Sequence, residues 1–82
     1  MFRVLGEQEN YLLVSNGDSY AVVERRAGRY YALRNRNREG LPLDDRGVAQ
    51  LIRRSGTADE VEARDLLASV ATQWRDLCEH VR

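Results

Sequence analysis

The sequence predicts an α+β fold, in which a three- to four-stranded antiparallel β-meander precedes two α-helices packed on one face of the sheet. Before the single proline, Pro42, apolar residues form short alternating runs, and after it they recur with helical spacing. Two pairs, Asn16-Gly17 and Ala27-Gly28, separate the early runs and indicate hairpin turns. We therefore expect one small domain over residues 1–82.

The expected strands are rich in aromatic and β-branched residues and are bounded by turn residues. They cover residues 11–15, 19–25 and 29–34, and a short fourth strand is indicated at residues 2–5. The sequence does not decide whether that fourth strand joins the sheet.

The loop lengths determine which side chains share a face of the sheet. Two-residue loops place Leu13 opposite Tyr20 in the first hairpin and Glu24 opposite Tyr31 in the second. One face then carries Tyr11, Leu13, Tyr20, Val22, Tyr31 and Leu33. The other carries Leu12, Val14, Ala21, Val23, Arg25, Tyr30, Ala32 and Arg34. We expect the helices to cover the first, bulkier set and to leave the second set open.

The first helix is predicted to follow Pro42 directly. Leu43 and Asp44 have the character of a hydrophobic staple and an N-cap, and Gly56 is a suitable stop. The apolar stripe between them is narrow and consists of Val48, Leu51 and Ile52.

A second, longer helix is predicted to run almost to the C-terminus. Thr57 to Glu60 match the Thr-x-x-Glu capping box, and about 24 residues follow without a break, or roughly 36 Å of helix. Its apolar stripe is Ala63, Leu67, Val70, Trp74, Leu77 and Val81.

This helix is longer than strands of five or six residues can cover. Its distal apolar residues are therefore a candidate interface, and they are Val70, Trp74, Leu77 and Val81. The alternative is that the first helix and the N-terminal strand cover this stripe.

Catalytic, metal-binding and cofactor-binding patterns are not found. The one cysteine, Cys78, and the one histidine, His80, lie two residues apart and point to different sides of a helix. A single residue of each type cannot supply a tetrahedral set of metal ligands. The six glycines form no phosphate-binding motif. We therefore expect a non-enzymatic protein without metal or cofactor.

The chain also lacks signals for membranes and secretion. No stretch approaches the ~18 apolar residues that a membrane span needs, and the N-terminus has no apolar run typical of a secretory signal. One cysteine excludes an internal disulfide and fits a reducing compartment. We expect a cytoplasmic protein that does not bind membranes.

Charge is unevenly distributed although the net charge is zero. All thirteen basic residues are arginine, which fits either codon bias or selection for forked donors. Residues 20–43 carry a net charge of +4 between two segments of −2 each. The candidate binding residues in this band are Arg25, Arg26, Arg29, Tyr30, Arg34, Arg36 and Arg38.

Three interpretations of this band remain open. Arginine and tyrosine are common anchors of protein interfaces. The same arginines could contact phosphates of nucleic acid, with tyrosine stacking on a base. They could also be solvated or paired with acidic side chains, since Asn35, Asn37 and Gly40 are typical of a loop.

The sequence therefore predicts a small binding module for a protein partner or a second copy of itself. It would use the distal part of the long helix, the arginine-bearing sheet face, or both. Nucleic-acid binding through residues 25–38 is the alternative, and zero net charge counts against it.

Overall fold

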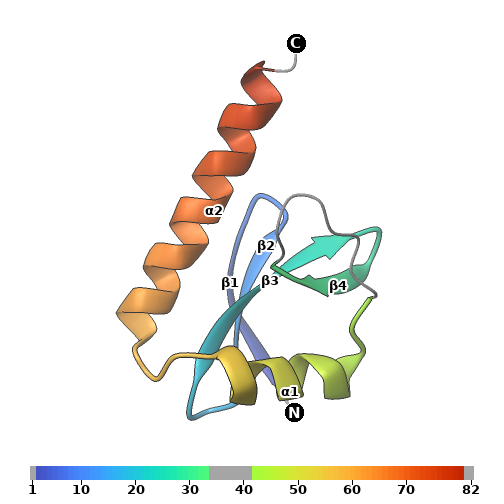
Figure 1. The fold of residues 1–82 in the computed structure, drawn as a ribbon, viewed down its shortest axis with the longest axis vertical. Helices are drawn as coiled ribbons and strands as arrows, with labels where there is room; N and C mark the ends of the chain where they lie inside the picture. The colour runs from blue at the N-terminus through green and yellow to red at the C-terminus, as the bar shows by residue number, and fades with distance from the viewer. Residues whose placement is uncertain (1, 34–41, 81–82) are drawn as a thin grey trace.

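The computed structural model describes residues 2–33 and 42–80, with side chains up to residue 77. Four strands form one antiparallel sheet in the order β1-β2-β3-β4. The strands are β1 (Arg3–Gln8), β2 (Tyr11–Ser15), β3 (Tyr20–Arg26) and β4 (Arg29–Ala32), and the helices are α1 (Asp45–Ser55) and α2 (Glu60–His80). The predicted α+β meander with a long C-terminal helix is confirmed (Figure 1).

The β3–β4 hairpin has the predicted two-residue turn. Ala27 and Gly28 take φ values of 52° and 78°, as a type I′ turn requires. Glu24 lies opposite Tyr31, which confirms the predicted register of this hairpin.

The β2–β3 hairpin has a longer loop than predicted. Leu13 lies opposite Val22 and not opposite Tyr20, so that the predicted register is wrong by two residues. The cause is the side chain of Asn16, whose Oδ1 accepts hydrogen bonds from the backbone N–H groups of Asp18 and Ser19, both at 2.9 Å. These bonds widen the turn to four residues. A shift of two leaves every side chain on its predicted face.

The two helices lie on opposite faces of the sheet, which corrects the prediction that they share one face. Val48 and Ile52 of α1 form a buried cluster with Leu12, Val14 and Val23. Ala63 and Leu67 of α2 form a second cluster with Leu13 and Val22. The face that was expected to stay open therefore lies beneath α1, because both faces of the central strands are apolar.

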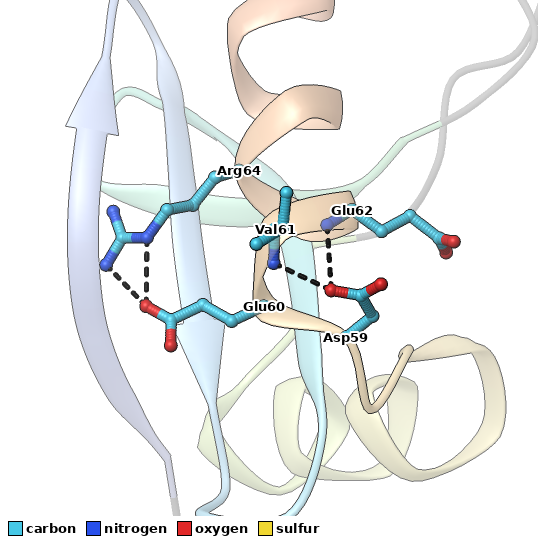
Figure 2. A network of polar contacts seen from close by, with 5 residues as sticks. All are labelled: Asp59, Glu60, Val61, Glu62 and Arg64. Carbon is cyan, nitrogen blue, oxygen red and sulfur yellow. Dashed lines mark hydrogen bonds and ion pairs between the residues drawn. The ribbon is translucent and has the colours of Figure 1, made fainter.

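The start of α2 also differs from the predicted capping box (Figure 2). Asp59 is the cap, and its Oδ1 accepts from the N–H groups of Val61 and Glu62 at 2.9 and 3.3 Å. Thr57 cannot serve because its N–H and C=O both pair with the backbone of Tyr20, at 2.8 and 2.7 Å. Glu60 does not reach back to the cap and instead pairs with Arg64 one turn later.

The start of α1 is as predicted. The N–H of Gly47 donates to Asp44 Oδ1 at 2.7 Å, and Leu43 packs against the cluster that contains Val48. At the other end, the N–H of Gly56 closes the helix by donating to the carbonyl oxygen of Ile52 at 2.9 Å.

Neither helix, over the residues that the structure describes, is long and apolar enough to cross a membrane. In the same part of the chain, no three histidine, cysteine, aspartate or glutamate side chains gather as a metal site would require.

Candidate binding surfaces

The arginine candidates of the β3–β4 hairpin do not form one surface. Arg25 and Tyr30 are cross-strand neighbours on the α1 side of the sheet. Arg25 forms an ion pair with Glu7 of β1. Tyr30 is half-buried, its ring meets that of Phe2 edge to face at 5.8 Å, and its carbonyl oxygen accepts from Leu43. Tyr30 is therefore chiefly a packing residue and not an open stacking platform.

Arg26 and Arg29 are cross-strand neighbours on the opposite face, next to the turn. The Arg26 guanidinium lies 4.2 Å from the centre of the Tyr31 ring and 3.6 Å from Glu24. These contacts engage Arg26 within the hairpin, whereas Arg29 is exposed. Of the other candidates, Arg34, Arg36 and Arg38 lie outside the described residues.

Sequence reasoning missed two arginines that α1 brings to the same region as Arg29. Arg46 and Arg53 are seven residues apart on α1 and therefore share one of its sides. Together with Arg29 and Tyr30 they line an open cavity of about 1040 Å³, which we call the arginine groove. Asp44 and Asp45 also line it, so that its charge is mixed. The seven-residue spacing was a usable signal, but no sequence pattern links α1 to the β3–β4 turn.

The described helix candidates differ in exposure. Val70 is half-buried and packs on the cluster beneath α2, and Trp74 is half-buried. Leu77 is 62% exposed, and Figure 1 shows the red, C-terminal end of α2 extending past the sheet. Val81 lies outside the described residues.

A second exposed leucine extends this apolar surface toward the start of α2. Leu66 is 44% exposed. Leu66, Val70, Gln73 and Leu77 are spaced 4-3-4 and form one line along the helix, which we call the α2 seam. The seam does not face β1, because Arg64, which lies on the other side of α2, approaches Gly6 of that strand together with the buried Leu67.

The α2 seam begins at an apolar cavity of about 390 Å³, which we call the edge groove. Its walls come from both helices and from the last part of the sheet, and they include Tyr20, Val22, Leu33, Leu51, Ala63 and Leu66. The groove exists because β4 ends at Ala32, so that the first residues of β3 have no β4 neighbour. An apolar side chain from outside could therefore contact both the sheet and α2 there.

The opposite side of α2 is held against β1 and its turn. Arg75 of α2 pairs with Glu9, in the turn after β1, at 3.1 Å. Burial in this region, followed by the Glu24 carboxylate, raises the pKa of Tyr11. This contact engages the Arg75 side of α2 and leaves Leu66 and Leu77 of the seam exposed.

Comparisons of the sequence with protein-family models and with curated proteins, and of the fold with solved structures, found no match.

Proposed function

We propose that this chain is a small, non-enzymatic, cytoplasmic protein-binding module that uses the α2 seam as its contact surface. One observation carries the proposal: Leu66 and Leu77, 44% and 62% exposed, lie on one line of α2 that leads into the edge groove. Large apolar side chains that lie together beside an apolar groove are typical of protein interfaces. A continuous seam with 4-3-4 spacing is the pattern by which one helix packs against another.

Charge substitutions in the seam test this proposal. With the chain as bait, Leu66→Glu and Leu77→Glu should each abolish capture of a protein that the wild type retains, because an unpaired carboxylate would be buried in the contact. Capture is measured by quantitative mass spectrometry of the retained proteins.

Val61→Glu is the matched control. Val61 is 68% exposed on the far side of α2. The substitution therefore adds the same charge to the same helix without touching the seam. The proposal fails if Val61→Glu and the seam variants lose the same proteins, or if none of them changes capture.

The arginine groove supports a second candidate function, the binding of nucleic acid. Arg29, Arg46 and Arg53 are three of the residues that line one cavity, and arginine is suited to phosphate contacts. Arg29 belongs to the set predicted on residues 25–38, whereas Arg25 and Arg26 of that set are engaged with Glu7 and Tyr31, and Arg34, Arg36 and Arg38 lie outside the described residues.

If the second candidate is correct, the double variant Arg46→Gln, Arg53→Gln should weaken binding of a labelled oligonucleotide. The slope of log K against log salt should become less negative by about 2, because two phosphate contacts are lost. Fluorescence anisotropy at several salt concentrations measures this slope. The control, Arg64→Gln with Arg75→Gln, removes two arginines that are already ion-paired on α2. Equal losses in both variants, or no binding at low salt, would exclude this function.

A further inference from the structure

We propose that the partner of the α2 seam is a second copy of this chain, with the two α2 helices packed antiparallel about a two-fold axis. This inference rests on the proposed function and specifies its partner. In the pair, Leu77 of each copy lies against Leu66 of the other, at the mouth of the edge groove.

The spacing of the seam has the symmetry that such a pair requires. Leu66 and Leu77 are equally far from the midpoint between Ala71 and Thr72, and so are Val70 and Gln73. An antiparallel two-fold axis at that midpoint brings each leucine opposite the other leucine of the second copy. Each seam residue and the residue opposite it in the second copy form one layer of the contact. The single two-fold rotation fills all four layers, so the contact is closed and self-complementary.

The two ends of the seam differ in shape, and the difference is complementary. At one end Leu77 is 62% exposed, and the C-terminal end of α2 extends past the sheet (Figure 1). At the other end Leu66 lines the edge groove together with Val22 and Leu33 of the sheet. The antiparallel operation places the projecting end of each helix over the groove of the other copy. The end of α2 would then lie beside α2 of the second copy, on the same face of its sheet.

Charge favours the antiparallel orientation over the parallel one. Residues 59–65 contain four acidic residues and one arginine, a net charge of −3, and residues 75–80 carry −1 with a neutral histidine. A parallel pair would bring the two −3 segments together. The antiparallel pair places each of them beside the weakly charged end and also opposes the two helix dipoles.

The other candidate for self-pairing, the open edge of β1, is interrupted. The register of β1 against β2 shifts between Val4 and Gly6, which leaves Leu5 as a bulge residue. Bulges at sheet edges disrupt the regular row of backbone groups that a second strand needs. The seam is therefore the better surface for a second copy.

The contact would be small, and this sets the expected affinity. Two helices that overlap along at most about 30 Å, with the groove walls added, fall at the low end of specific interfaces, near 1,200 Å² in total. We expect exchange between monomer and dimer at micromolar concentration. Trp74, the only tryptophan, lies beside Gln73 near the axis and provides an emission signal for assembly.

The test uses Leu66→Glu and Leu77→Arg in the full chain, alone and mixed. Sedimentation velocity over a concentration series should show a wild-type dimer, and each variant alone should raise the dissociation constant about 100-fold, because both layers then hold an unpaired charge. An equimolar mixture should form a heterodimer within about tenfold of wild-type affinity. In this heterodimer one Leu66/Leu77 layer pairs the introduced glutamate with the introduced arginine, and the other Leu66/Leu77 layer keeps its two leucines.

Only the antiparallel arrangement allows this rescue, since a parallel pair would leave both charges facing leucine. Val61→Glu should dimerise as the wild type does, and circular dichroism checks that each variant is folded. A dimer that the single variants do not weaken, or a mixture that stays monomeric, overturns the antiparallel seam. A monomeric wild type that still captures another protein through the seam overturns the second copy as partner and leaves the proposed function standing. If that seam-dependent capture is absent as well, both proposals fail.

Discussion

Gly56→Ala is expected to destabilise the protein by about 3–5 kcal/mol. A Cβ atom at this position would lie 2.3 Å from the carbonyl oxygen of Ile52 and 2.9 Å from that of Tyr20. Both atoms belong to the backbone, and both accept hydrogen bonds, one closing α1 and one holding Thr57 to β3. Relieving the clash therefore requires that the end of α1 or the edge of the sheet move.

Urea denaturation monitored by circular dichroism measures this loss. A domain of this size has a stability of about 4–12 kcal/mol, so the loss is at least about a quarter of the total and should lower the urea midpoint in proportion. Gly6→Ala is the control, because its Cβ would meet only side-chain atoms of Arg64 and Leu67 at 3.8 and 3.9 Å. It should stay within about 1 kcal/mol of the wild type. An unchanged urea midpoint for Gly56→Ala would contradict the close approach of α1 to β3.

Ile52→Ala is expected to cost about 2–5 kcal/mol. Ile52 is fully buried and is the largest residue that α1 contributes to the cluster on its face of the sheet. Truncation removes three methyl and methylene groups and leaves a cavity between α1 and Leu12, Val14 and Val23. The fixed strands beneath cannot close this cavity fully.

The same denaturation measurement compares Ile52→Ala with Leu51→Ala. Leu51 is the next residue on the same helix, but it is half-buried and lies at the margin of the cluster beside the edge groove. Its truncation should cost clearly less than that of Ile52. Equal costs would show that α1 is not seated on the sheet through Ile52.

The sequence was sufficient for the approximate positions of the strands and the two helices and for the β3–β4 turn, since these depend on local patterns. Ala27-Gly28 gave the correct register because the pair fits a two-residue turn, whereas Asn16-Gly17 did not, because the Asn16 side chain caps two further backbone groups. A dipeptide pattern contains no information on that side-chain choice. The capping box failed for a related reason, since the Thr57 carbonyl oxygen accepts from the distant Tyr20 N–H and not from the first turn of a helix.

The distribution of the helices over the two faces was the main error. Comparing the bulk of the two sets of strand residues suggested one core face, but Leu12-Leu13-Val14 and Val22-Val23 are apolar on both sides of the pleat. Continuous apolar runs are typical of strands that are covered on both faces. Giving that signal priority would have placed one helix on each face. The same signal would also have removed Tyr30 from the predicted open binding surface. By contrast, the distal position of Leu77 followed from the length of the helix alone.

The pair of hydrogen bonds between Tyr20 and Thr57 has a mechanical consequence for the whole molecule. Within the described ranges, the backbones of α1 and α2 do not approach each other closely, and each helix rests on its own side of the sheet. The linker that joins them is nonetheless tied to the margin of β3, so neither helix can swing away without straining the other's anchor. Breaking this one backbone pair would therefore loosen the segment that joins both layers.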